Sequence, residues 1–182
     1  MKNLFYTMIL FFVMSTFVNA QDKWINFKSV DFAFIAEFPN EPKKSVQKVP
    51  TAVGDIDMYM FTLQSTNNDD NNAIYSVIKS DYPEEQFENA DDEYNNTVLN
   101  GAVNGAVTNV NGELVFDNKI AFNGYPGRSF KINIDQAYIY MNAYLVENTI
   151  YITQVICMKQ KDQNEDINRF LGSFDIIKVK GV

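Results

Sequence analysis

The chain has 182 residues, 46% of them hydrophobic, and its 23 acidic and 15 basic residues give a formal net charge of −8. This length fits one domain, and the acidic balance argues against nucleic acids and anionic membrane surfaces as partners. The chain has no histidine and a single cysteine, which excludes histidine-based nucleophilic catalysis and an intramolecular disulfide.

The first 20 residues have the features of a secretory signal peptide. Lys2 precedes an apolar run from Leu4 to Met14, and Val18-Asn19-Ala20 fits a cleavage site. The run is short for a membrane span, and an uncleaved anchor helix is the alternative. We expect an exported protein, periplasmic or secreted, that is cleaved near Ala20 and does not span a membrane afterwards. No cysteine follows the run, so a lipoprotein anchor is not expected, and residues 21–182 are predicted to form a single domain.

Several strands are predicted before residue 80. Segments 32–38, 56–63 and 73–79 alternate between two sets of side chains, as strands do. The lysine-rich segment 42–50 is predicted to be an exposed connection or an edge strand. The hydrophilic segment 67–72 lacks the glycine and the distal glutamate of a calcium loop, so we interpret it as a solvated loop.

One long helix is predicted to start at Asp81-Tyr82-Pro83-Glu84 and to end at Asn111-Gly112. Asp81 and Glu84 fit a capping box, and the acidic residues gather near the N-terminus, where the helix dipole favours them. Gly101 and Gly105 lie four residues apart and predict a close approach of this helix to the sheet. The apolar stripe, at steps of three and four, consists of Phe87, Tyr94, Val98, Leu99, Ala102, Val103 and Ala106.

Residues 120–158 are predicted to form a three-stranded meander at the centre of the sheet. It follows a strand at residues 113–120. Its first strand alternates through Phe130, Ile132 and Ile134, and its third is apolar at almost every position from 150 to 157. A period of two indicates that one face is buried. The core face of the second strand consists of Ile139, Met141, Ala143 and Leu145.

A short helix at residues 162–171 and a last strand at residues 173–179 complete the predicted elements. The order is strands, a long helix, a meander, a short helix and a final strand. This order predicts an α+β fold: a largely antiparallel β-sheet packed with one long and one short helix.

The other face of the second meander strand carries the candidate binding residues. Tyr138, Tyr140, Asn142 and Tyr144 share this face, and tyrosine suits recognition surfaces because it combines apolar area with a polar tip. The alternative is a face half-covered by a helix. Arg128 follows a Pro-Gly turn and either binds an acidic partner group or bonds neighbouring carbonyls. We take these five residues as candidates for contacts with a ligand or partner.

No reaction class is indicated. The sequence contains no phosphate-binding loop, dinucleotide fingerprint or zinc spacing. Cys157 lies in an apolar strand and is predicted to be a core thiol. We therefore predict no catalytic residue, no metal site and no cofactor.

The order of elements and four short motifs resemble the PsbP/DcrB-like fold of exported bacterial proteins. The motifs are EFPNEP (37–42), the turn at 51–54, GYPGR (124–128) and RFLGSF (169–174). The resemblance implies a PsbP-like α/β/α sandwich. It also implies a non-enzymatic binding, assembly or accessory role, since the fold has no defined catalytic motif. The lack of an N-terminal cysteine departs from the lipoprotein members.

Two functions follow as hypotheses. The first is an exported binding or accessory protein that acts through contacts with an envelope or secreted protein. The second is a small-ligand carrier with a pocket lined by Tyr138, Tyr140 and Tyr144. A carboxylate-based hydrolase would need two carboxyl groups buried together in a cleft.

Overall fold

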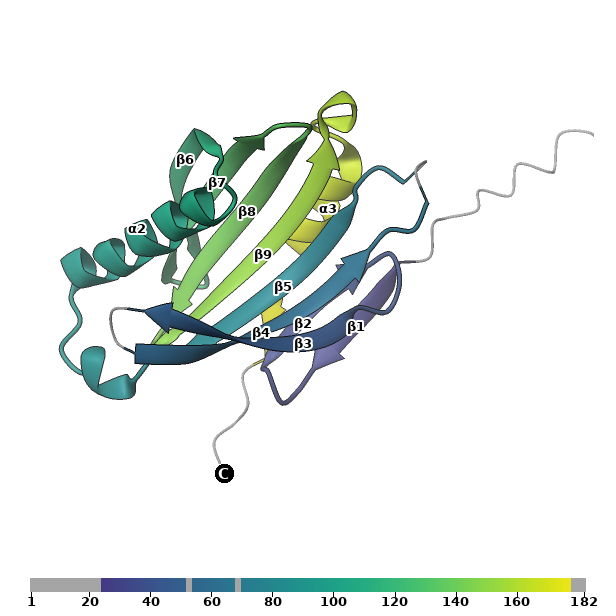
Figure 1. Cartoon of the computed structure of the whole chain (residues 1–182). Coiled ribbons are helices and arrows are strands. Elements are labelled where there is room, and N and C mark those ends of the chain that lie inside the picture. The colour runs from purple at the N-terminus through teal and green to yellow at the C-terminus, as the bar shows by residue number, and fades with distance from the viewer. Residues whose placement is uncertain (1–23, 52–53, 68–69, 178–182) are drawn as a thin grey trace, which may run out of the picture.

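The protein is described by a computed structural model that covers residues 24–51, 54–67 and 70–177. Its main element is a seven-stranded antiparallel sheet with the order β3-β4-β5-β9-β8-β7-β6 (Figure 1). These strands are β3 (Lys43–Thr51), β4 (Gly54–Gln64), β5 (Ile74–Asp81), β6 (Glu113–Phe122), β7 (Tyr125–Ile134), β8 (Ala137–Val146) and β9 (Thr149–Met158).

The remaining elements lie against this sheet or lead into it. A three-stranded sheet has the order β1-β2-β10. The elements are β1 (Ile25–Ser29), β2 (Phe34–Phe38), β10 (Asp175–Ile176), the α-helices α2 (Asp92–Asn109) and α3 (Glu165–Ser173), and the 3-10 turns η1 (Glu84–Gln86) and η2 (Lys159–Lys161). The predicted α+β class is confirmed.

The predicted meander is confirmed, with β9 in the middle of the seven strands. The register pairs Phe130 with Met141 across β7 and β8, and Met141 with Gln154 across β8 and β9. Because side chains alternate along each strand, this register sorts the apolar residues onto two separate faces.

The first face of the sheet packs against α2. Leu99 and Val103 of the helix are buried against Ile132, Ile139 and Leu145 of the strands. This is the core face predicted from the sequence.

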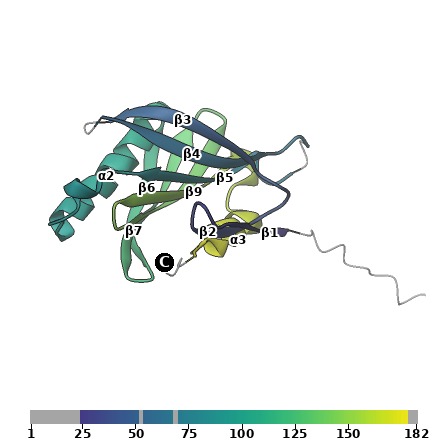
Figure 2. The same ribbon diagram turned by 90° about the horizontal axis from the view of Figure 1, so that it is seen from below.

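The opposite face packs against a layer made of the small sheet and α3. Figure 2 shows β1, β2 and α3 on the side of the large sheet away from α2. Phe34 and Phe38 of β2 and Phe170 of α3 are fully buried there, together with Val155 and Cys157 of β9. Cys157 is thus the core thiol that its apolar strand predicted, and burial raises the pKa of this thiol. Both faces of the sheet are covered, as in the predicted α/β/α sandwich.

The long helix differs from its prediction. It begins at Asp92, and the Asp91 carboxylate caps it by accepting a 2.8 Å hydrogen bond from the Tyr94 backbone N–H. The segment around Phe87 forms only a 3-10 turn. The predicted start at Asp81–Glu84 is therefore wrong, because Asp91 and not Asp81 supplies the N-cap.

The predicted close approach of α2 to the sheet at Gly101 and Gly105 is also wrong. A Cβ added at Gly101 or Gly105 would meet nothing within 4 Å, and both residues are exposed. Neither glycine therefore serves close packing of the helix on the sheet.

The N-terminal part contains a hairpin that the sequence did not reveal. The single strand predicted at 32–38 is β2, and it pairs with β1 in a sheet of its own. Ala33, with φ of 55°, lies in the bend between them. Segment 42–50 is an edge strand, as one of its two predictions stated.

Some predictions fall outside the described residues. These are the signal peptide at residues 1–20, the end of the last strand beyond residue 177 and part of the 67–72 loop. In the part of the chain that the structure describes, no helix has both the length and the hydropathy needed to cross a membrane.

Candidate functional site

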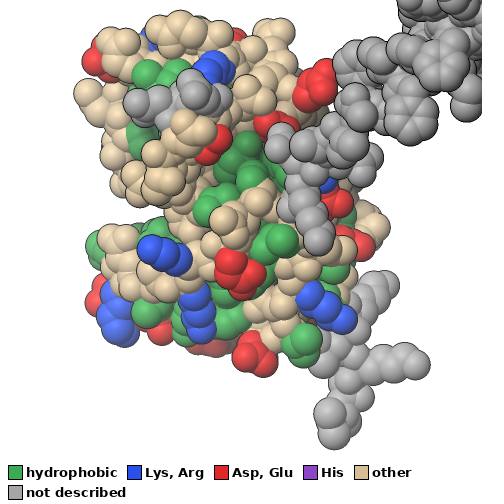
Figure 3. Space-filling view, turned by 90° about the vertical axis from the view of Figure 1, so that its right-hand side faces the viewer, with side chains coloured by type: hydrophobic (Ala, Val, Ile, Leu, Met, Phe, Trp, Pro, Cys, Tyr) green, Lys and Arg blue, Asp and Glu red, His purple; other side chains and the backbone are tan. Residues whose placement is uncertain are grey.

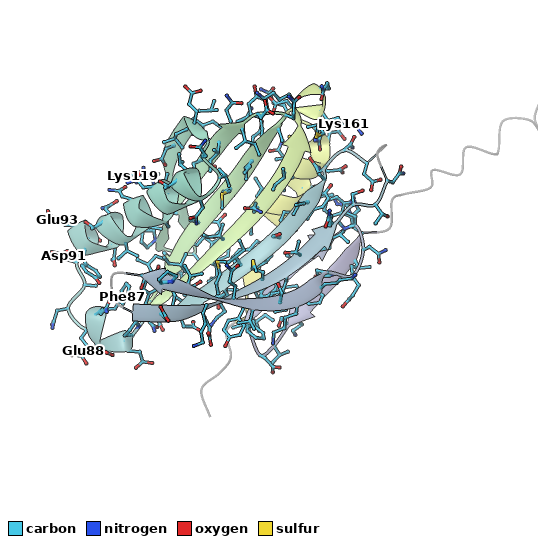
Figure 4. All side chains as sticks on the ribbon, in the orientation of Figure 1. Phe87, Glu88, Asp91, Glu93, Lys119 and Lys161 are labelled. Atoms are coloured by element: carbon cyan, nitrogen blue, oxygen red, sulfur yellow. The ribbon has the colours of Figure 1, made fainter. Side chains whose placement is uncertain are left out.

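A cleft opens between the β6–β8 end of the large sheet and the start of α3. Its volume is about 490 Å³, which is within the usual range for small-molecule sites. In Figure 4 the labelled Lys161 marks the end of the sheet at which α3 begins. The cleft is lined by Val115, Phe116, Lys131, Tyr140, Gln163, Asn164, Ile167 and Asn168.

A buried lysine forms part of the cleft wall. The Lys131 side chain is only 8% exposed, and its Nζ lies 2.8 Å and 2.9 Å from the two carboxylate oxygens of Asp162. The Tyr140 hydroxyl donates a 2.6 Å hydrogen bond to the same carboxylate. Asp162 lies in the link between η2 and α3, so this cluster joins the short helix to the centre of β7 and β8.

Two tyrosine rings enclose the ammonium group. Lys131 Nζ lies 3.7 Å from the Tyr138 ring centroid and 4.7 Å from the Tyr140 ring centroid. Lys159 Nζ also lies 5.5 Å from the Tyr138 ring centroid. Cation–π attraction therefore adds to the ion pair in holding Lys131.

The cluster fixes the charge of its members. Burial by itself would raise the pKa of Asp162, but the hydrogen bonds from Lys131 and Tyr140 outweigh it and lower that pKa. Burial would lower the pKa of Lys131, and the bond to Asp162 reverses this and raises it. Burial, followed by the bond to Asp162, raises the pKa of Tyr140. At neutral pH the site therefore holds one ammonium, one carboxylate and a neutral phenol.

The structure brings four of the five candidate residues together on one covered sheet face. Tyr140 lines the cleft, Tyr138 lies over Lys131, and Asn142 donates a 3.1 Å hydrogen bond to the Tyr144 hydroxyl. Tyr144 is buried and stacks on Phe174 with ring centroids 5.6 Å apart. The tyrosine row is thus partly core and partly cleft wall.

Arg128 lies on the other face of the sheet, away from the tyrosines. Its guanidinium makes a bidentate ion pair with Asp117, in which Nε lies 2.7 Å from the carboxylate. The guanidinium also donates a hydrogen bond to the side-chain oxygen of Asn100 in α2. These contacts tie α2 to β6 and β7.

Sequence reasoning missed Lys131 and Asp162 as site residues. The signal for Lys131 was present, since it alternates with buried residues inside a central strand. Its partner lies 31 residues away, in a segment that was interpreted only as a helix start.

A second hollow lies where the chain enters β1. Figure 3 looks onto this side and shows a waist between two lobes with hydrophobic side chains in it. A pocket of about 390 Å³ is lined there by residues that include Trp24, Tyr75 and Asp166. Asn72, at the end of the predicted solvated loop, is instead buried and bonds Tyr75 and Asn164. Because these polar groups are paired with one another, we interpret this network as structural.

Metal ligands are not grouped in the described residues. Within 24–51, 54–67 and 70–177, no three Cys, Asp or Glu side chains are placed so that they could hold an ion. The Lys131–Asp162 cluster has one carboxylate, which already accepts hydrogen bonds from Lys131, Tyr140 and the Gln163 backbone N–H.

Comparisons with known proteins found matches among solved structures. No protein-family model and no curated protein matches the chain. Among solved structures, the chain is similar to the solution structure of cyanobacterial PsbP from Synechocystis sp. PCC 6803, with 9% identity over 87% of this chain and 95% of that chain, and a TM-score of 0.49.

Proposed function

We propose that this chain is an exported, non-enzymatic binding protein and that the cleft beside α3 holds a small ligand. The observation that carries the proposal is the Lys131–Asp162–Tyr140 cluster in the wall of a cleft of about 490 Å³. A few fixed polar groups among apolar walls are typical of ligand sites.

The same cluster argues against proton-transfer catalysis. A general acid or base works best with a pKa near the operating pH. Here the pKa of Asp162 is lowered, while the pKa values of Lys131 and Tyr140 are raised. Each group is therefore held in one protonation state, which suits orientation of a ligand more than exchange of protons.

Ligand binding is tested on the protein purified in its exported form from its host. Native mass spectrometry of freshly purified protein should show a species heavier than the chain, and denaturation should release the added mass. A bare mass, together with no thermal shift across a panel of metabolites, would remove the ligand-binding proposal. The same spectrum tests export, since the signal peptide predicts a chain that begins near Gln21.

Contacts with a protein partner are the second candidate, favoured by the open edge at β6. Leu114 is 40% exposed and Val115 is 52% exposed, and among the described strands β6 has a neighbour on one side only. Val115 also lines the cleft. An extended segment of a partner would pair with this edge and reach the cleft. A photocrosslinker at Val115 should capture one defined partner, whereas a crosslinker at Glu88, on the far side of the molecule, should not; equal capture at both positions would contradict this candidate.

A further inference from the structure

The outer edge of β3 is open from residue 43 to residue 49 in the part of the chain that the structure describes. β3 has only β4 as a neighbour there, and the register between the two strands has no shift. In Figure 1 and Figure 2, β3 is the outermost ribbon at its side of the large sheet. The outward backbone groups of residues 43–49 have no hydrogen-bond partner among the described residues. Such a row of N–H and C=O groups is able to pair with a further strand.

The side chains along this edge are basic and exposed. Residues 43–48 are all exposed, and β3 contains no acidic residue. Its three lysines are Lys43, Lys44 and Lys48. Lys48 Nζ lies 3.7 Å from Asp57 Oδ1 on β4, whereas Lys43 and Lys44 form no ion pair within the described residues. The unpaired positive charge of the edge is therefore concentrated at Lys43 and Lys44.

An apolar patch adjoins one of these lysines. Lys44 Nζ lies 4.1 Å from the ring centroid of Phe32 and 5.6 Å from that of Tyr59. Val46 is 57% exposed and lies opposite Tyr59, on the same face of β3 as Lys44. Lys44 is thus held by aromatic rings and not by a carboxylate, so its charge remains available to a partner.

A second copy of this chain does not fit the edge. Antiparallel pairing of two β3 strands centred on Val46 would place Lys44 of each copy opposite Lys48 of the other, and like charges directly opposite are destabilising. Lysine on an edge strand commonly prevents such pairing. The same charges attract an acidic segment. Because charges are largely screened beyond about 8 Å at physiological ionic strength, a segment in contact with the edge is affected more by these lysines than by the net charge of −8.

We propose that the edge of β3 binds an extended acidic segment of a partner protein, which joins the seven-stranded sheet as a further strand. Main-chain hydrogen bonds supply the affinity in this mode, and the side chains opposite supply the specificity. In an antiparallel arrangement, an apolar residue of the segment lies opposite Val46, and two consecutive acidic residues lie opposite Lys44 and Lys43. The pattern selected is therefore apolar-x-acidic-acidic. The edge is separate from the cleft beside α3, so this inference is independent of the ligand-binding proposal.

The test is an NMR titration of the exported protein with three synthetic peptides capped at both ends. The first is Thr-Thr-Val-Thr-Glu-Glu-Thr. The second has lysine in place of both glutamates, and the third has proline in place of every threonine, which removes backbone N–H groups that strand pairing needs. The glutamate peptide should shift the backbone amides of residues 43–49. The other two peptides should bind about tenfold more weakly or not at all.

Charge reversal on the protein tests the same contact from the other side. Lys44→Glu should weaken binding of the glutamate peptide about tenfold and strengthen binding of the lysine peptide. Lys119→Glu, at an exposed position of β6, changes the net charge equally at the opposite edge of the sheet. It is the matched control and should bind both peptides as the wild type does. Lys43→Glu is a second variant in case Lys44→Glu does not fold, because Lys43 is exposed.

Three results would overturn the proposal. The first is equal binding of the glutamate and lysine peptides, and the second is equal binding of the proline peptide, which would show attraction without strand pairing. The third is the absence of shifts at residues 43–49 with the glutamate peptide at millimolar concentration.

Discussion

At the scale of single residues, the buried charge of Lys131 has the strongest consequences. Its ammonium group stays charged inside the protein because Asp162 lies 2.8 Å away and Tyr138 and Tyr140 surround it. Breaking such a pair by removing one partner leaves an uncompensated buried charge. The stability of the α3 end of the molecule should therefore depend on Asp162.

Asp162→Asn tests this dependence. We expect the free energy of unfolding in urea to fall by about 2 kcal/mol, less than for a fully buried pair because Asp162 is partly exposed. Glu113→Gln, at the exposed start of β6, is the control and should leave the urea midpoint unchanged. Equal midpoints for wild type and Asp162→Asn would contradict the role given to the pair.

The same pair predicts a pH dependence in acid. The pKa of Asp162 is lower in the folded state than its ordinary value of 3.8, so the unfolded chain binds the proton first as the pH falls. The pair's contribution is complete above that value and is lost as the pH falls through the folded pKa. The stability difference between wild type and Asp162→Asn should therefore shrink in strong acid.

The burial of some single side chains could be predicted from the sequence, and that of others could not. The burial of Cys157 followed from its apolar strand, and the shared face of Tyr138, Tyr140, Asn142 and Tyr144 followed from alternation. The depth at which each tyrosine is buried did not follow. It depends on α3 and β2, which reach this face from distant parts of the chain.

At the scale of elements, the glycines separate two kinds of constraint. A Cβ at Gly127 of β7 would lie 2.6 Å from the Ala143 carbonyl oxygen and 2.9 Å from Tyr144 Cδ1, whereas a Cβ at Gly101 or Gly105 meets nothing within 4 Å. Gly127 is thus required by packing between strands. The two helix glycines only increase the flexibility of the unfolded chain.

Three alanine substitutions test this contrast. Gly101→Ala and Gly105→Ala should each raise the free energy of unfolding by about 0.5–1 kcal/mol, because alanine favours the helix. Gly127→Ala should lower it by about 1–3 kcal/mol, because backbone and ring must move apart. Thermal unfolding measures all three, and a destabilised Gly101→Ala would show that α2 packs more closely than described.

The elements were predicted well where the pattern is local and poorly where two local signals compete. The meander has a period of two through β7 and β8 and an apolar run through β9, so its strands were placed closely. The start of α2 was misplaced because both Asp81 and Asp91 are good N-caps. The β1–β2 hairpin was missed because its bend contains Ala33, with a positive φ, where glycine or asparagine is the usual signal.

At the scale of the whole molecule, the two layers bury tyrosines that bear on alkaline stability. Burial raises the pKa of Tyr75 and of Tyr151 to about 12, from 10.0. Between these values the folded protein keeps both phenolic protons, while the unfolded chain releases them. Their contribution is therefore complete below pH 10.0 and is lost as the pH rises toward about 12.

We accordingly expect the free energy of unfolding to decline through this alkaline range, and the decline to be shallower in Tyr151→Phe. Tyr151 loses only one 3.1 Å hydrogen bond to the Phe32 carbonyl in that variant. Urea unfolding at a series of pH values measures the slope. A flat profile for the wild type would contradict the burial of these two side chains.

The overall architecture was predictable as a class, while the cleft was not. The order of elements indicated α+β, but the position of α3 against one end of the sheet depends on contacts such as Lys131–Asp162 and Asn72–Asn164. These residues are far apart in the sequence. The same layer that covers the centre of the sheet leaves the β6 end open, and that unequal cover creates the cleft.

The central claim is that ligand binding takes place in this cleft, and blocking the cleft tests it most directly. Asn168→Trp places a large ring at its mouth, while Glu165→Trp places the same ring on α3 outside the lining. In native mass spectra of the exported proteins, wild type and Glu165→Trp should carry the added mass of a ligand and Asn168→Trp should not. An Asn168→Trp protein that retains the ligand at wild-type occupancy would contradict the claim.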